Sequence, residues 1–137
     1  MKKIMLCVLL AVAGGVGFAQ RLIESSDDYE VIGDTLIKYL GTETHVVILD
    51  NLSIKKIADA FKGSNIVSVN IPYGVTSIGV GAFLLCSLTS ITIPSSVASI
   101  GQRAFGDCSS LRTVRLSRHT KYWNDTFPPS TVITYSD

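Results

Sequence analysis

The segments IVSVNIP (66–72), LTSITIP (88–94) and LRTVRLS (111–117) repeat one pattern, with apolar residues at the first, fourth and sixth positions. A second motif precedes each of these segments, as IADAF (57–61), IGVGAF (78–83) and IGQRAF (100–105). Its final phenylalanine returns every 22 residues, as Phe61, Phe83 and Phe105. A fixed period of this length predicts a stack of similar coils, in which each coil contributes one strand to a shared sheet.

Alternation along each strand determines which residues face the core. The fourth and sixth positions of the first motif are separated by one residue, so both point inward and the residue between them points outward. The inward residues are Val69, Ile71, Ile91, Ile93, Val114 and Leu116. The outward residues are Ser68, Asn70, Ser90, Thr92, Thr113 and Arg115. Pro72 and Pro94 lack a backbone N–H and are expected to end the first two strands.

The second motif is expected to fill the core. Val75 and Ile78, or Val97 and Ile100, can point inward ahead of an Ala-Phe pair. The alanine is small where the chain turns, and the phenylalanine fills the space beneath it. One aromatic ring at the same position of every coil predicts a spine of rings along the solenoid axis.

The unit ITIPSSVASIGQRAFGDCSSL (91–111) resembles the BspA-like leucine-rich repeats of bacterial surface antigens, because proline, glycine, the Ala-Phe pair and cysteine recur together. The fold expected is a β-rich leucine-rich-repeat solenoid with parallel strands, about five coils of about 22 residues, and a cap at each end. The resemblance further implies an exported bacterial protein whose solenoid binds components of a host or of neighbouring cells.

Residues 1–19 have the three parts of a secretory leader. Lys2 and Lys3 come first, an apolar run extends from residue 4 to 13, and small residues lead to Ala19. This order predicts cleavage after Ala19. The apolar run is shorter than the about 20 residues of a membrane-spanning helix, although an uncleaved anchor is the alternative. We therefore expect export to the periplasm, the cell surface or the extracellular space.

Residues 20–137 are expected to form a single domain. Residues 20–50 would hold an N-terminal segment and a hairpin cap, 51–117 the repeats, and 118–137 a C-terminal cap. Gly33-Asp34 suits a type II′ hairpin turn, because glycine readily adopts positive φ, and residues 46–49 should form a third strand. After residue 117 the repeat is abandoned, but large apolar residues remain: Tyr122, Trp123, Phe127, Val132, Ile133 and Tyr135. They would cover the last coil or, alternatively, form a ligand platform.

No catalytic constellation stands out in the sequence. His45 and His119 belong to no recognisable nucleophile or zinc-binding motif, the carboxylates are dispersed, and there is no glycine-rich phosphate loop. The sequence therefore predicts neither an enzyme nor a cofactor or metal site. Cys86 and Cys108 occupy equivalent positions of neighbouring coils. They are buried free thiols, a disulfide, which export would permit, or metal ligands.

Charge is distributed unevenly along the chain, although its formal total is only +1. The N-terminal part is acidic, with Glu24, Asp27, Asp28, Glu30 and Asp34. The C-terminal part is basic, with Arg103, Arg112, Arg115, Arg118, His119 and Lys121. Because Arg115 is in the outward row, part of the basic set should share the sheet face, where it would attract acidic surfaces or simply solvate the last coil.

These features favour a secreted or surface-exposed interaction module, an adhesin in the most specific form of the hypothesis. It would bind a protein or a sulfated glycan, with host extracellular matrix as one candidate, whereas nucleic acid is not an expected partner. The candidate binding residues are Ser68, Asn70, Ser90, Thr92, Arg112, Thr113, Arg115 and Arg118. The rival hypothesis is an envelope scaffold that associates with itself or with another envelope protein through a cap.

Overall fold

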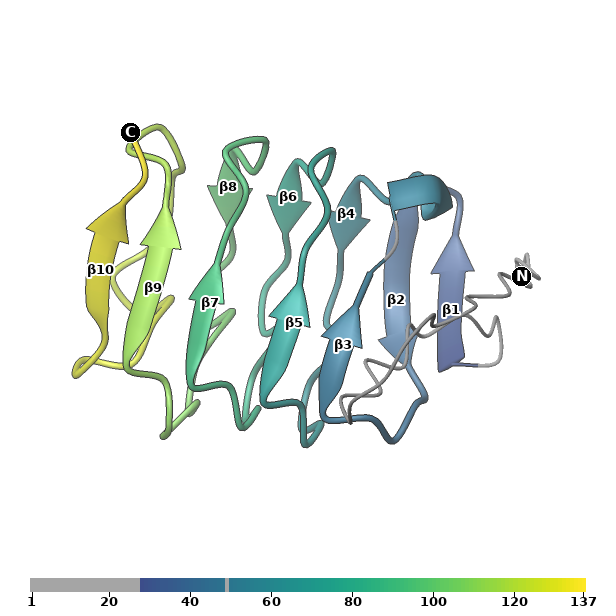
Figure 1. The fold of residues 1–137 in the computed structure, drawn as a ribbon, viewed down its shortest axis with the longest axis horizontal. Coiled ribbons are helices and arrows are strands. Elements are labelled where there is room, and N and C mark those ends of the chain that lie inside the picture. The colour runs from purple at the N-terminus through teal and green to yellow at the C-terminus, as the bar shows by residue number, and fades with distance from the viewer. Residues whose placement is uncertain (1–27, 49) are drawn as a thin grey trace, which may run out of the picture.

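The computed structural model describes residues 28–48 and 50–137, so the expected leader and cleavage position lie outside the described residues. The chain winds into a solenoid of about five turns whose strands form two rows, with β1 and β10 at opposite ends (Figure 1). The expected leucine-rich-repeat solenoid is confirmed. The strands are β1 (Tyr29–Ile32), β2 (Thr35–Tyr39), β3 (His45–Val47), β4 (Lys56–Ile57), β5 (Ser68–Asn70), β6 (Ser77–Ile78), β7 (Ser90–Thr92), β8 (Ser99–Ile100), β9 (Thr113–Leu116) and β10 (Val132–Tyr135).

One row consists of β3, β5, β7, β9 and β10 (Figure 1). Within it β3 pairs with β5, β7 with β9, and β9 with β10, always in parallel. The strands β5 and β7 end at Asn70 and Thr92, two residues before Pro72 and Pro94, as the loss of the proline N–H predicts. All six predicted inward residues are buried and all six predicted outward residues are exposed.

The second row is a five-stranded sheet in the order β1-β2-β4-β6-β8. Sequence analysis placed Ile78 and Ile100 in the core but predicted no strands there, because two residues are too few to show alternation. The structure pairs β4, β6 and β8 in parallel, with Ile57 opposite Ile78 and Ile78 opposite Ile100. A repeating coil therefore contributes one strand to each of the two rows, which lie on opposite sides of the core.

The N-terminal hairpin forms as expected. The strands β1 and β2 pair antiparallel, with Ile32 opposite Thr35, and Gly33 has φ of 61° as the turn requires. A short 3-10 helix, η2 (Asp50–Leu52), follows β3. The third strand begins at His45, one residue earlier than predicted, and Leu49 lies outside the described residues.

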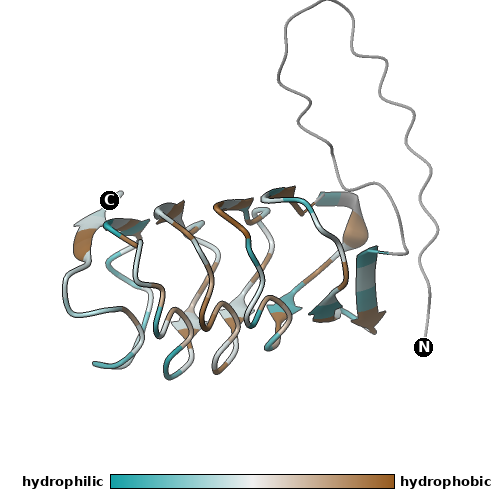
Figure 2. Cartoon of the chain, turned by 90° about the horizontal axis from the view of Figure 1, so that it is seen from below, coloured by the Kyte–Doolittle hydropathy of each residue, from teal (hydrophilic) through white to brown (hydrophobic). Residues whose placement is uncertain are grey.

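A column of aromatic rings forms the centre of the core. Phe61, Phe83 and Phe105 are fully buried, and their centroids lie 5.0 Å apart with almost parallel planes. The predicted spine is therefore confirmed. It also extends to Tyr39, 5.2 Å from Phe61, and to Phe127, 5.2 Å from Phe105. Figure 2 shows the coils stacked side by side along this axis, with polar and apolar residues alternating along them.

Cys86 and Cys108 are buried and form no disulfide with each other, as the first of the three alternatives predicts. The Cys86 thiol donates to the carbonyl oxygen of Phe61 at 2.9 Å, and the Cys108 thiol donates to that of Phe83 at 3.0 Å. Each thiol thus ties its coil to the preceding one. Burial raises the pKa of both groups, that of Cys108 to about 11, which keeps them protonated at neutral pH.

Residues 118–137 leave the sequence pattern, but their backbone continues the course of the coils. Lys121 forms a bridge with Ser99 beside β8, Phe127 adds a ring to the spine, and β10 pairs with β9. Thr126 replaces the alanine of earlier coils, is fully buried, and donates its hydroxyl to the Gly101 carbonyl at 3.2 Å. The expected C-terminal cap is thus built on the path of one further coil.

Candidate binding face

The outward side chains of β3, β5, β7, β9 and β10 form a surface that we call the outward face. Parallel register aligns them within the sheets β3-β5 and β7-β9-β10, and the 22-residue period places Ser90 and Thr92 of β7 beside Ser68 and Asn70 of β5, so that two ladders follow the row. One ladder consists of His45, Ser68, Ser90, Thr113 and Val132, and the other of Val47, Asn70, Thr92, Arg115 and Thr134. Neighbouring strands are about 4.8 Å apart, so these side chains repeat at that spacing, and half of them bear a hydroxyl. The face is therefore flat and polar.

Arg115 is the longest side chain of these two ladders. It is exposed on β9, with Thr92 on one neighbouring strand and Thr134 on the other. No side-chain hydrogen bond or ion pair joins its guanidinium to another residue in the described part of the chain. The five N–H donors of the guanidinium are thus available to a ligand, and the neighbouring side chains on either strand are small and bear hydroxyl groups.

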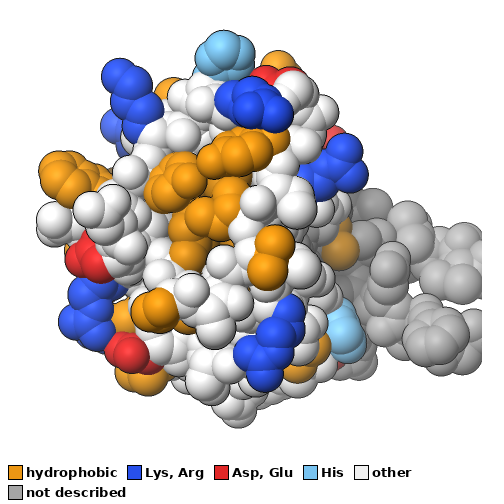
Figure 3. Space-filling view, turned by 90° about the vertical axis from the view of Figure 1, so that its left-hand side faces the viewer, with side chains coloured by type: hydrophobic (Ala, Val, Ile, Leu, Met, Phe, Trp, Pro, Cys, Tyr) orange, Lys and Arg blue, Asp and Glu red, His pale blue; other side chains and the backbone are white. Residues whose placement is uncertain are grey.

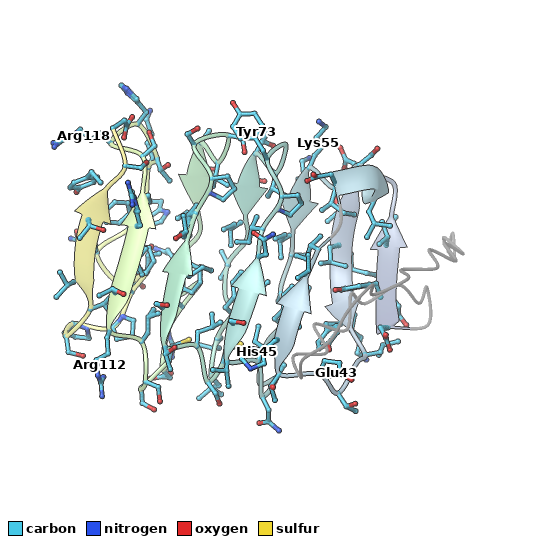
Figure 4. The ribbon with its side chains drawn as sticks, in the orientation of Figure 1. Glu43, His45, Lys55, Tyr73, Arg112 and Arg118 are labelled. Carbon is cyan, nitrogen blue, oxygen red and sulfur yellow. The ribbon has the colours of Figure 1, made fainter. Side chains whose placement is uncertain are left out.

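Arg112 and Arg118 flank this position at opposite ends of β9 (Figure 4). Both are exposed but already hold protein contacts. Arg112 donates from Nη1 to the Ser109 carbonyl at 3.1 Å. Arg118 donates from Nε to the Asp137 carbonyl at 2.7 Å, and its guanidinium carbon lies 4.9 Å from the centroid of the Tyr135 ring. Of these three arginines, Arg115 therefore has the fewest side-chain contacts with the described residues.

The rest of the basic set does not share the outward face. Arg103 lies at a turn and forms an ion pair with Asp107 at 2.8 Å. Lys121 pairs with Ser99 on the opposite side of the core. His119 lies 3.9 Å from Asp137 and is almost fully exposed. Sequence analysis expected only part of the set to share the sheet face. Arg115 lies on β9, and Arg112 and Arg118 lie just before and just after this strand.

The carboxylate of Asp137 holds the end of the last coil against β9. The backbone N–H of Arg118 donates to Oδ1 at 3.0 Å, and the Ser117 hydroxyl donates to Oδ2 at 2.9 Å. These donors, led by the Arg118 amide, hold the pKa of Asp137 below its usual range. The interaction fixes Arg118 next to Tyr135 and so defines one border of the outward face.

The C-terminal end of the solenoid carries an aromatic cluster. The hydroxyls of Tyr122 and Tyr135 lie 3.3 Å apart, and Tyr122 packs edge-on against Phe127 at 5.4 Å. Phe127 is buried, as a cap requires, but Trp123 and Val132 are more than half exposed. Figure 3 shows apolar side chains across the middle of this end, with lysine and arginine side chains around them. The cluster therefore covers the core while leaving apolar surface exposed.

The described residues, 28–48 and 50–137, contain no group of three or more His, Cys, Asp or Glu side chains placed to hold a metal ion. Within the same residues, no helix is long and apolar enough to cross a membrane. The outward face and the aromatic end thus stand as the two surface features of interest.

Comparison with known proteins agrees with this geometry. The family model of the BspA type leucine rich repeat region matches residues 30–134 in six copies. Among solved structures, the chain is similar to the leucine rich repeat protein of T. pallidum, with a TM-score of 0.51 and 26% sequence identity. The match covers 69% of this chain and 59% of that protein. A search of curated proteins found no match.

Proposed function

The chain belongs to the BspA-type leucine-rich-repeat family, whose members are typically surface or exported modules for protein interaction, and from this premise we propose that it is an exported adhesive module. Its partner would be a macromolecule with a negatively charged surface, either a protein or a sulfated glycan. The surface that binds it would be the outward face around Arg115. Repeats of this family generally form interaction modules rather than catalytic sites.

The single observation that carries this proposal is the environment of Arg115. Its guanidinium is exposed, has no hydrogen-bonding or ionic partner among the described residues, and lies between the small side chains of Thr92 and Thr134. A flat floor lets an extended or planar partner approach the guanidinium closely. Arginine also matches carboxylate and sulfate-like oxygens with two parallel hydrogen bonds.

The neighbouring residues support a binding surface larger than one side chain. Arg112 and Arg118 are three residues to either side of Arg115, so the three cations extend over roughly 20 Å at the rise of a strand. Between them the two ladders offer hydroxyl and amide groups at Ser68, Asn70, Ser90 and Thr113. Charge would guide the encounter, and the polar groups would contribute specificity.

The test is binding to a panel of extracellular-matrix proteins and sulfated glycans. The wild type is compared with Arg112→Glu/Arg115→Glu and with Lys56→Glu/Lys62→Glu. The control pair makes the same change in net charge, but Lys56 lies on β4 in the other sheet and Lys62 on a turn. Salt-sensitive binding that is lost only in the arginine variant would support the proposal. Equal binding by all three proteins, or by none, would contradict it.

A further inference from the structure

Exposed apolar side chains gather at the two ends of the solenoid. Nine large hydrophobic residues are exposed in the described part of the chain. Six of them lie near an end, namely Ile32 and Leu40 in the N-terminal cap region and Tyr122, Trp123, Val132 and Tyr135 in the C-terminal one. Terminal coils of solenoids usually present a polar outer surface, because they have no neighbour to cover them. Both ends therefore depart from the usual design of a cap.

The C-terminal end is the less completely covered of the two. Ile133 and Tyr135 pair with the buried residues Val114 and Leu116 and so occupy inward positions. Ile133 is nevertheless only partly buried, and Tyr135 is 42% exposed. In the N-terminal hairpin the core residues Tyr29 and Val31 are buried. The core thus remains partly open beside β10, whose outer edge pairs with no strand of the described residues.

The two ends also carry opposite charge. Residues 28–50 contain five carboxylates and a single lysine: Asp28, Glu30, Asp34, Glu43, Asp50 and Lys38. Residues 112–137 contain four cations and two aspartates: Arg112, Arg115, Arg118, Lys121, Asp125 and Asp137. Figure 3 shows cations around the apolar surface of the C-terminal end. Two C-terminal ends facing each other would bring like charges together, whereas opposite ends would attract.

We propose that the C-terminal end of the solenoid docks onto the acidic N-terminal end of a second copy of the chain. The contact covers Trp123, Val132 and the open core beside β10, and it places Arg112 and Lys121 opposite the acidic hairpin end. Such a head-to-tail contact uses two different surfaces, so each copy retains one unfilled end and chains of copies can grow. This assembly overlaps the outward face only at its margin, at Val132 and Arg112, and leaves Arg115 and the strands β3, β5 and β7 exposed along the side of the solenoid.

Charge reversal tests the direction of the contact. One variant carries Arg112→Glu/Lys121→Glu at the C-terminal end, and the other carries Glu30→Lys/Asp34→Lys/Asp50→Lys at the N-terminal end, so the charge counted above changes from +2 to −2 at the first end and from −4 to +2 at the second. Each protein is purified in the form that the expressing cells accumulate. The molecular mass of the particles in solution is then measured by sedimentation over a wide range of protein concentrations. The wild type should associate, and each variant alone should associate at least about tenfold more weakly, because like charges then face each other.

Mixing the two variants restores opposite charges at both kinds of contact, so the mixture should associate like the wild type. Trp123→Ser should weaken association while Tyr73→Ser, an exposed residue on a middle coil (Figure 4), should not. If charge reversal disturbs folding, the comparison of Trp123→Ser with Tyr73→Ser tests the proposal instead. A monomeric wild type would overturn the proposal. Undiminished association of the N-terminal variant alone would also overturn it, because that result indicates contact between two C-terminal ends.

Discussion

The rings of Phe83 and Phe105 lie 5.0 Å apart at their centroids, with planes that differ by 5°. Their separation of 22 residues in the sequence is thereby converted into one step of a stack in space. Phe61 continues the stack on the other side of Phe83 at the same distance. Phe83 is therefore enclosed by rings on both faces.

Truncating this central ring should be costly. Phe83→Ala is expected to reduce the free energy of unfolding by about 3–5 kcal/mol, because it removes a fully buried ring and leaves a cavity between two others. Denaturant unfolding measures the change. Phe127→Ala at the end of the spine is the matched comparison and should lose less, since only one spine ring stacks on Phe127. A loss below about 1 kcal/mol for Phe83→Ala would be incompatible with this packing.

Replacing Leu85 with glycine should stabilise the fold. Its φ is 61°, in the left-handed region, and its side chain is exposed. The equivalent residue of the preceding coil is Gly63, with φ of 71°. Leu85→Gly is expected to raise the free energy of unfolding by about 0.5–1 kcal/mol, because relief of strain exceeds the added entropy of the unfolded chain.

Two controls separate strain from the loss of the leucine side chain. Leu85→Ala keeps the strained backbone and should be nearly neutral. Gly63→Ala introduces the same strain one coil earlier, where an added Cβ meets no neighbouring atom within 4 Å. It should cost about 1 kcal/mol. A stabilising Gly63→Ala or a destabilising Leu85→Gly would refute this explanation.

Alkaline pH should destabilise the fold through the buried thiols. Burial raises the pKa of Cys108 from 9.0 to about 11. An unfolded chain therefore ionises this thiol first, so the stabilising effect is complete below pH 9 and is lost as the pH rises to 11. The pKa values of Cys86 and Tyr29 are also raised by burial and act in the same direction.

Urea unfolding across this pH range measures the effect. Cys108→Ser retains a hydroxyl donor for the Phe83 carbonyl but does not ionise, so its stability should fall less steeply than that of the wild type. Identical pH profiles for the two proteins would show that Cys108 is not the group responsible.

The sequence was most informative where the repeat is regular. Phe61, Phe83 and Phe105 share the Ala-Phe motif, and so their stacking could be predicted. Tyr39 and Phe127 follow the same period, but they come after Lys38 and Thr126 instead of alanine and were not assigned to the spine. The spacing of 22 residues alone would have assigned both rings to the spine, but the prediction also required the Ala-Phe motif.

The candidate site was predictable only in part. Alternation placed Arg115 and its hydroxyl neighbours on the outward face, because the register of parallel coils follows from the repeat. The contacts of the other cations depend on the turns and on the irregular last coil. The ion pair of Arg103 with Asp107 and the contacts of Arg118 with Asp137 and Tyr135 therefore had no signal in the pattern.

The most direct test of the proposed binding face is the affinity of the Arg115→Glu variant for a partner identified in the panel. The wild type and Lys56→Glu are measured beside it at low and at high salt. We expect Arg115→Glu to lose about tenfold or more at low salt, and the difference to shrink at high salt as charges are screened. Equal affinities for Arg115→Glu and Lys56→Glu would contradict binding through the outward face.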